Sequence, residues 1–327
     1  MNMYLGALNR QSAVRSFALG DVRLTYVVDG AMAMLPSGFF PGIARNYWDA
    51  HPEMLDERGR LAMSAGGLLV ERDGRRLLID AGLGPVRGPV HVSGDLVGHS
   101  DCGALLHTLA ALGHTPEDIE AVAFTHLHVD HTGWAFTPRQ PEMPAKGELP
   151  GKAEEPGKAE EPGKAGKTFP RARYLVAARE WAPHGCGTRI PGAPAVDVLT
   201  RMGAEHTSVD DGEEIFPGVC ALVTPGHSPG HTSYVISAGN ERVVVLGDVF
   251  HTPAQLAHPE WPSRPDSDQD GVMAARERLT AELRRPGTTG FAFHFGDQAF
   301  GRLTGTDWTP VPARALLPTP RTLQAGV

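Results

Sequence analysis

The sequence has only three cysteines, Cys102, Cys186 and Cys220, among 327 residues. They lie far apart, are odd in number and form no Cys-x-x-Cys pair, so neither a disulfide framework nor a thiolate zinc site is predicted. This cysteine usage fits a reducing compartment, and we expect a cytoplasmic protein. We expect no signal peptide, because residues 1–20 are interrupted by polar side chains such as Arg10.

Long apolar runs and an excess of positive charge are also missing. No stretch is apolar over the length needed to cross a bilayer. The formal net charge is −8 and the pI about 6.0, which argues against nucleic acid and anionic membranes as partners. Hydrophobic residues make up 41% of the chain and charged residues 21%, as in ordinary globular proteins. We therefore expect a single domain over residues 1–327.

Glycine and proline are abundant, at 39 and 28 residues, and part of this excess lies in one low-complexity segment. Within residues 146–167 the tetrapeptide Pro-Gly-Lys-Ala recurs with a period of six. A segment without an apolar face cannot bury enough surface to offset the entropy lost on ordering. Residues 146–167 are therefore predicted to form a flexible, solvated loop insertion within the domain.

The remaining sequence predicts groups of strands separated by helices. Strands are predicted over or near residues 22–29, 66–72, 75–80, 119–125, 173–177, 218–224, 233–237, 242–246 and 289–293. Helices are predicted over 101–112 with Asp101 as the N-cap, around 180–181, and over 271–283. This order favours a layered α/β architecture with two sheets over a regular βαβ repeat.

The most informative segment is Thr-His-Leu-His-Val-Asp-His at residues 125–131, directly after a predicted strand. Three histidines and an aspartate within six positions are difficult to bury without partners. Imidazole nitrogens and carboxylate oxygens are donors that zinc and similar divalent ions accept. The segment therefore predicts a metal site that uses His126, His128, Asp130 and His131.

Further donor residues follow three later apolar strands. They are His227 and His231 in Pro-Gly-His-Ser-Pro-Gly-His, Asp248 and His251 in Gly-Asp-Val-Phe-His, and His294 after Phe-Ala-Phe. Strand ends on the same edge of a sheet can converge in space, and loops held there commonly carry binding chemistry. We expect His231 to hydrogen-bond loop backbone or to support a metal ligand.

The succession His-x-His-x-Asp-His, Pro-Gly-His, Gly-Asp and a late histidine resembles the metallo-β-lactamase fold superfamily. The resemblance runs from the strand at residue 22 to His294 and omits the insertion and the C-terminal tail. Residues 246–253, Leu-Gly-Asp-Val-Phe-His-Thr-Pro, with 257–261 behind them, look closest to the branch of methyl parathion hydrolase-like enzymes and quorum-quenching lactonases. This resemblance implies a four-layer αββα sandwich with a metal centre at one edge.

Carried over to this sequence, the resemblance implies two divalent metal ions, zinc foremost, with manganese, cobalt or iron as alternatives. The implied ligands are His126, His128 and His227 for one ion, Asp130, His131 and His294 for the other, and Asp248 as the bridge. The number of donors supports two ions independently, because one zinc accepts four or five ligands including water.

Such a centre implies a hydrolase that uses a metal-bridging hydroxide to open lactones or to cleave esters or phosphotriesters. Asp130 and Asp248 are the expected catalytic carboxylates, and Asp248 would orient the water. His251 is expected either to contact the substrate or to be structural, since some lactonases carry a tyrosine at this spacing. The expected partner is a small-molecule substrate, and a homodimer is left open.

Five aromatic residues are candidates for an apolar pocket mouth, although a core position is the favoured interpretation for any single one of them. They are Phe39, Phe40, Trp134, Trp181 and Phe250.

Other functions within the same fold are left open. A persulfide dioxygenase uses a single iron with fewer ligands, and the presence of Asp130, His131 and His294 argues against it. Diiron flavoproteins fit less well, because His128 stands where they carry a carboxylate. A β-lactam hydrolase is compatible with the ligands, but the expected cytoplasmic location fits that role poorly. A purely structural metal is disfavoured, because structural zinc sites are closed and usually rich in thiolates.

Overall fold

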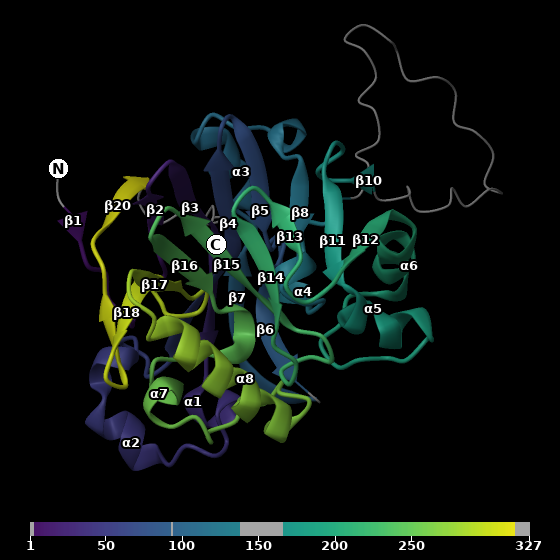
Figure 1. Ribbon diagram of the computed structural model, residues 1–327. Coiled ribbons are helices and arrows are strands. Elements are labelled where there is room, and N and C mark those ends of the chain that lie inside the picture. The colour runs from purple at the N-terminus through teal and green to yellow at the C-terminus, as the bar shows by residue number, and fades with distance from the viewer. Residues whose placement is uncertain (1–2, 93, 138–165, 318–327) are drawn as a thin grey trace, which may run out of the picture.

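The computed structural model describes residues 3–92, 94–137 and 166–317, and two β-sheets lie face to face at its centre (Figure 1). The first sheet has the order β1 (Met3–Tyr4), β20 (Ala313–Leu317), β2 (Val14–Leu19), β3 (Val22–Met34), β4 (Leu61–Arg72), β5 (Arg75–Ile79), β8 (Ala121–Ala123), β11 (Arg173–Ala177) and β12 (His206–Val209). A hairpin of β6 (Arg87–Val92) and β7 (Asp95–Cys102) joins it through β3.

The second sheet follows chain order from β13 to β19. Its strands are β13 (Glu214–Phe216), β14 (Val219–Val223), β15 (Thr232–Ala238), β16 (Glu241–Val245), β17 (Thr288–Phe291), β18 (Phe300–Thr304) and β19 (Asp307–Pro310). The helices are α1 (Pro36–Phe39), α2 (Arg45–Ala50), α3 (Leu105–Ala111), α4 (Val129–Thr132), α5 (Ala178–Gly185), α6 (Val196–Glu205), α7 (Ala254–Ala257) and α8 (Gln269–Leu283), with 3₁₀ turns η1 (Pro52–Met54), η2 (Pro116–Asp118) and η3 (Gly247–Val249).

Strand alternation separates the core between the sheets from the cores beneath the helices. In β5, Leu77 and Ile79 face the core shared by the two sheets, whereas Leu78 faces the core beneath the helices on the outer side. In β16, Val243 and Val245 likewise face inward. Because both faces of these strands are buried, they are continuous apolar runs in the sequence.

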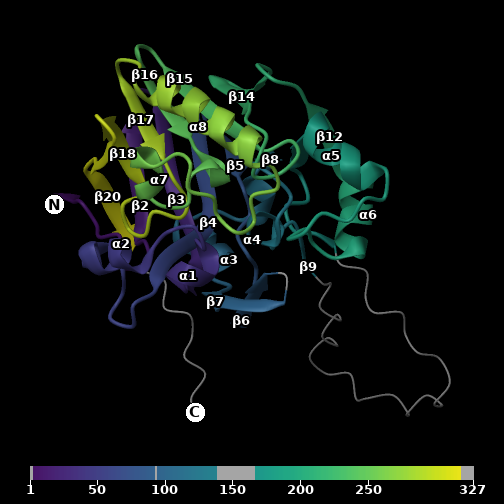
Figure 2. The ribbon, with the colours of Figure 1, turned by 90° about the horizontal axis from the view of Figure 1, so that it is seen from below.

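Helices cover the outer face of each sheet. Helix α8 packs on β16, β17 and β18 through buried side chains such as Leu279, and Figure 2 shows it lying along the second sheet. Helix α3 packs on β3, and α5 and α6 pack on β11, all on the first sheet. The structure therefore has the predicted four-layer αββα order. Among the described residues, no helix combines the length and apolar character needed to cross a bilayer.

The start of the first predicted long helix is wrong. Asp101 is not an N-cap, because it lies in β7, where it pairs with Ala31 of β3, and α3 begins only at Leu105. Instead, the buried carboxylate of Asp29 accepts the Leu105 N–H at 2.9 Å. A carboxylate distant in the sequence thus satisfies a donor that a local cap would otherwise satisfy.

Most of the predicted insertion, residues 146–165, lies outside the described residues. Its last two residues do not fit the prediction of a flexible loop. Gly166 and Lys167 form β10, which pairs antiparallel with Thr137 and Phe136 of β9. The C-terminal boundary of the insertion is therefore earlier than predicted.

Several strands end at one common edge of the sandwich. Ile79 of β5 is in parallel register with Ala123 of β8, so Asp80 and the loop that begins at Thr125 emerge together. In the second sheet, Val245 of β16 is in parallel register with Phe291 of β17. Asp248 and His294 consequently follow neighbouring strand ends, and the sheet framework gathers the donor residues.

Candidate metal centre

The loop after β8 is built around the buried carboxylate of Asp80. This carboxylate accepts hydrogen bonds from the backbone N–H of Thr125 at 2.7 Å and from its hydroxyl at 2.8 Å. His126 follows directly, and His128 is the extended N-cap residue of the short helix α4. The turn of α4 carries Asp130 and His131 back towards the strand ends.

Three histidines from two loops form a first group of donors. Ligand atoms of His126, His128 and His227 lie within 4.8 Å of one another, and the three side chains are buried. The ring centroid of His126 is 4.4 Å from that of His128 and 4.7 Å from that of His227. Both loops therefore contribute to one compact triangle of imidazoles.

A second group consists of Asp130, His131, Asp248 and His294, whose ligand atoms also lie within 4.8 Å of one another. Asp248 faces both groups. Its Oδ1 lies 3.2 Å from His131 Nε2 and 3.1 Å from His294 Nε2, whereas its Oδ2 lies 3.4 Å from His227 Nε2. One carboxylate thus directs a different oxygen at each donor group.

The buried polar atoms at the centre fit divalent metal ions. His126 Nε2, His131 Nε2, His294 Nε2 and Asp248 Oδ1 are buried without a hydrogen-bond partner among the described residues. A buried donor or acceptor without a partner is destabilising by about 1–3 kcal/mol. Imidazole and carboxylate atoms that converge in this way are the ligand set that zinc and related divalent ions accept.

Burial sets the charge state of two imidazoles in the first group, His126 and His128. It lowers the pKa of His126 well below its ordinary value, and the neighbouring His131 and His128 rings lower it further. Burial, together with the nearby His227, lowers the pKa of His128 to about 3. Both rings are therefore neutral at pH 7, which is the form of imidazole that binds a metal.

In the second group, carboxylates prevail over burial. Burial lowers and the surrounding carboxylates, Asp248 foremost, raise the pKa of His131 and His294, with a net upward direction for both. Burial raises and the neighbouring imidazoles lower the pKa of Asp248, with a net downward direction. The centre therefore favours an ionised Asp248.

Each group is held from outside by residues that sequence reasoning did not single out as part of the site. Asp80 Oδ2 lies 2.8 Å from His131 Nδ1, and Asp266 Oδ1 lies 2.9 Å from His227 Nδ1. Carboxylates that bind the remote nitrogen of a ligating histidine orient the ring. Asp80 had a usable signal, because it ends a predicted strand before Ala-Gly-Leu-Gly, whereas Asp266 lies outside any predicted element.

His231 supports the carboxylate that faces both groups, in agreement with its predicted supporting role. Its Nε2 accepts the backbone N–H of Asp248 at 2.9 Å, and its Nδ1 lies 2.9 Å from Thr224 Oγ1. The ring passes so close to Gly247 that a Cβ there would lie 2.3 Å from His231 Nε2. Gly247 also has φ +55, so a side chain at this position would be strained as well as obstructed.

His251 is placed at the centre but belongs to neither of the two groups described above. Its Nε2 lies 3.1 Å from Asp248 Oδ2, and its ring stacks on that of His294 at 5.6 Å. With His227 and Asp266 it forms a third cluster of candidate ligand atoms. Burial lowers the pKa of His251, although Asp248 opposes this shift.

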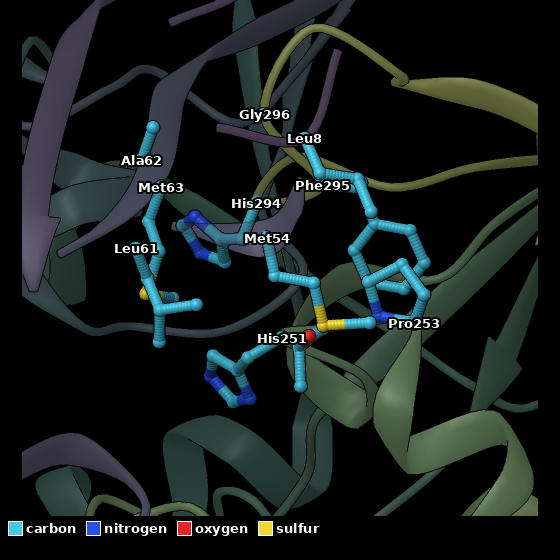
Figure 3. A pocket seen from close by; sticks show the side chains of 11 residues that line it. Leu8, Met54, Leu61, Ala62, Met63, His251, Pro253, His294, Phe295 and Gly296 are labelled. Atoms are coloured by element: carbon cyan, nitrogen blue, oxygen red, sulfur yellow. The ribbon is translucent and has the colours of Figure 1, made fainter. Parts of the chain in front are cut away.

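A cavity of about 240 Å³ opens onto the two groups. Its polar lining includes Asp130, Asp248 and His251, and its apolar wall includes Met32, Met34, Met63, Phe39, Val90 and Val92. A smaller cavity of about 10 Å³ also borders the His251 and His294 rings, beside Met54, Leu61 and Met63 (Figure 3). The site therefore combines a few polar groups with a largely apolar surround.

Of the five aromatic candidates for the pocket mouth, only Phe39 lines the larger cavity. Phe40 and Phe250 are fully buried in the core. Trp134 is buried and donates its Nε1–H to Asp29 at 2.8 Å. The Trp181 ring lies 4.5 Å from the His206 ring, tilted by 40°, and lines a separate cavity away from the metal centre. For these four the core or structural interpretation is the right one, because their rings pack beneath or beside the strands.

Comparisons with known proteins agree with this architecture. A family model described as the metallo-beta-lactamase superfamily matches residues 67–285. No curated protein matches the sequence. The structure of AidC, a dizinc quorum-quenching lactonase in complex with an acyl-homoserine product, superposes with a TM-score of 0.70 at 19% identity and covers 93% of this chain and 98% of AidC.

Two further solved structures are similar over most of their length. The hydrolase AbOPH of the beta-lactamase superfamily has a TM-score of 0.66 at 21% identity, with 93% of this chain and 99% of AbOPH covered. A probable metal-dependent hydrolase from Staphylococcus aureus has a TM-score of 0.65 at 19% identity, with 90% and 99% covered. At such identities these likenesses show the fold alone.

Proposed function

Because this chain belongs to the metallo-beta-lactamase superfamily, we propose that it is a binuclear metal-dependent hydrolase acting on lactones, with related esters and phosphotriesters as further substrates. The observation that carries the proposal is Asp248, whose two carboxylate oxygens face two different groups of donors. These donors outnumber the four or five ligands that one zinc accepts, so they would hold two ions, with Asp248 facing both.

In this proposal the first group binds one divalent ion and the second group binds another, with Asp248 contacting both. The proposed ligands are His126, His128 and His227, then Asp130, His131 and His294. We propose zinc, because neutral imidazoles dominate the first group and the structure of AidC is described as dizinc. When bound, such ions supply a nucleophilic hydroxide near neutral pH and polarise the substrate's carbonyl or phosphoryl oxygen.

In this proposal the protein's own residues orient the metal ligands and transfer a proton to the leaving group. His231 and Asp80 fix Asp248 and His131 in place through hydrogen bonds of 2.9 and 2.8 Å. His251 Nε2 lies within hydrogen-bond reach of Asp248 Oδ2, and the ring borders the cavity. Because burial lowers the pKa of His251, the neutral ring would take up a proton through Asp248 and pass one to the leaving oxygen. Asp130, with its side chain 17% exposed, is the carboxylate that faces incoming substrate.

The cavity supports an acyl lactone as the first substrate to test. Methionine, phenylalanine and valine side chains form its wall, and apolar walls favour acyl chains over highly charged substrates. Among the structural neighbours, AidC and an N-acyl homoserine lactone hydrolase were solved with an N-hexanoyl-homoserine product. The three cysteines are free, which fits the proposed cytoplasmic location.

The test combines metal analysis with a substrate panel. We expect two zinc ions per purified chain and turnover of acyl-homoserine lactones, with aryl esters, paraoxon-type triesters and nitrocefin tested alongside. His128→Ala should lower turnover about 1,000-fold or more, because it removes a proposed ligand whose ion contributes several kcal/mol to the barrier. Circular dichroism should show the variant folded.

His99→Ala is the matched control, since His99 is exposed in β7 and borders neither metal group. It should retain wild-type turnover. One metal per chain with no turnover on any of these substrates would contradict the proposal. A single iron with oxygen consumption would favour the dioxygenase instead.

A further inference from the structure

Glu180 is a buried carboxylate that belongs to neither proposed ligand group. It lies in the first turn of α5 and is only 2% exposed. Helix α5 follows β11, which runs parallel to β8 in the first sheet. Because β8 leads into His126, the start of α5 lies beside the loop that carries the first histidines.

The carboxylate of Glu180 joins the two loops that supply the first group. Its Oε1 accepts the backbone N–H of Leu127 at 3.0 Å, and Leu127 lies between His126 and His128 in the chain. Its Oε2 accepts the Ser228 hydroxyl at 2.7 Å and the Gly230 N–H at 2.8 Å, both in the loop after His227. A single side chain thus fixes one loop with each oxygen.

The contact between α5 and the second of these loops leaves no spare room. A Cβ at Gly230 would lie 2.0 Å from the backbone nitrogen of Glu180. Within the described part of the chain, Glu180 makes no ion pair. Its buried carboxylate is satisfied by three hydrogen-bond donors, which come from Leu127, Ser228 and Gly230. Hydrogen bonds from these donors fix the carboxylate relative to both loops, because its two oxygens bind two separate backbone segments.

We propose that Glu180 is the positioning residue of the first metal group, holding His126, His128 and His227 at the separation one ion requires. This inference rests on the proposed metal centre. The second group is held by other contacts, since His131 bonds Asp80 and His294 Nδ1 bonds the Ser64 carbonyl at 2.9 Å. Loss of the Glu180 carboxylate therefore weakens one metal site and spares the other.

Zinc affinity, measured by competition with a chromogenic chelator, tests the proposal in two backgrounds. His294→Ala removes a ligand of the second group and leaves the first group as the remaining site, and His128→Ala does the reverse. Adding Glu180→Gln should weaken zinc binding about 10-fold or more in the His294→Ala background. In the His128→Ala background the change in zinc affinity should stay within about twofold. Glu180 does not contact Asp80 or the Ser64 carbonyl, which hold His131 and His294 of the second group.

Two further variants separate positioning from general stability. Ser228→Ala removes one of the three hydrogen bonds and should give the same pattern with a smaller loss, even where Glu180→Gln folds poorly. Glu282→Gln is the matched control, because Glu282 is a partly buried carboxylate on α8 that pairs with Arg242 and lies outside both groups. It should leave zinc affinity unchanged in both backgrounds.

The outcomes divide clearly. Equal weakening in both backgrounds, or weakening in neither, would overturn the positioning role of Glu180. If the wild-type chain binds two zinc ions but hydrolyses none of the panel, the proposed hydrolase function fails while the zinc affinities still decide the role of Glu180. If the wild-type chain binds no zinc, both proposals fail.

Discussion

The residues of the candidate centre differ in their proposed roles because their side chains make different contacts. Asp248 faces both donor groups, whereas Asp80 and Asp266 contact the rings of His131 and His227 at the nitrogens remote from the centre. His251 is different, because its Nε2 lies beside Asp248 and the ring borders the cavity. We propose a catalytic role for His251 on this basis, rather than ligation in either metal group.

His251→Ala should lower kcat about 100-fold while two zinc ions per chain are retained, because a placed proton donor contributes at this level or above. Steady-state kinetics and metal analysis of the purified variant measure both quantities. Loss of one ion would instead identify His251 as a ligand, and kcat within twofold of wild type would make the residue structural.

Secondary-structure elements act in this protein as supports for short loops at their ends. The donors follow β8, β14, β16 and β17, and η3 and α4 are single turns that aim them. These loops are bound to each other by buried side chains such as Glu180 and His231. Because the sheets are rigid, a few side-chain hydrogen bonds suffice to define the geometry of the loops.

The low-complexity insertion is an element whose removal the fold should tolerate. Gly166 pairs with Thr137, so β9 and β10 hold the two flanks of residues 138–165 together. Deleting 148–165 shortens the connection between β9 and β10 from 28 to 10 residues, and loop-closure entropy then predicts a gain of about 1 kcal/mol in the free energy of unfolding.

Urea unfolding of the deletion variant with saturating zinc measures this change. Turnover should match that of the full chain, since none of the proposed ligands lies between residues 148 and 165. Insolubility, or a free energy of unfolding lower by more than about 2 kcal/mol, would show that the segment contributes to the folded structure.

At the scale of the whole molecule, the two sheets and their ends form one connected framework. Strand β20, near the C-terminal end of the described residues, pairs with β1 and β2 near the N-terminal end. The first sheet contributes His126 and His131 to the centre, and the second contributes Asp248 and His294. We propose on this basis that residues 1–327 form a single domain.

Metal removal should therefore affect the stability of the entire fold. The proposed ligands come from distant parts of the chain, so the unfolded chain lacks the site, and each ion at 1,000 times its Kd stabilises the folded state by about 4 kcal/mol. Chelation should abolish turnover and lower the melting temperature by several degrees, and zinc, cobalt or manganese should restore both.

Calorimetry before and after dialysis against a chelator provides the measurement. An unchanged melting temperature together with unchanged turnover would show that no metal contributes to this fold or its activity.

Much of this fold can be read from local patterns, because local chemistry suffices to produce them. Turn residues Asp73 and Gly74 predict the hairpin of β4 and β5, and apolar runs predict β11 and β16 closely. The cluster at 125–131 already indicates a metal, since so many donors are hard to bury otherwise. By contrast, the hairpin of β6 and β7 escapes prediction, because it joins the sheet only through the pairing of β7 with the distant strand β3.

Local patterns carry no information about which distant residues come into contact. In this protein the tertiary structure determines which side chains surround the donor residues. Asp266 and Glu180 lie outside any motif, yet they hold His227 and the loops around it. Tertiary packing likewise places Phe39 at the cavity and brings Trp134 to Asp29. Donor types are a property of the residues themselves, whereas their separations, charge states and supports depend on through-space proximity and burial.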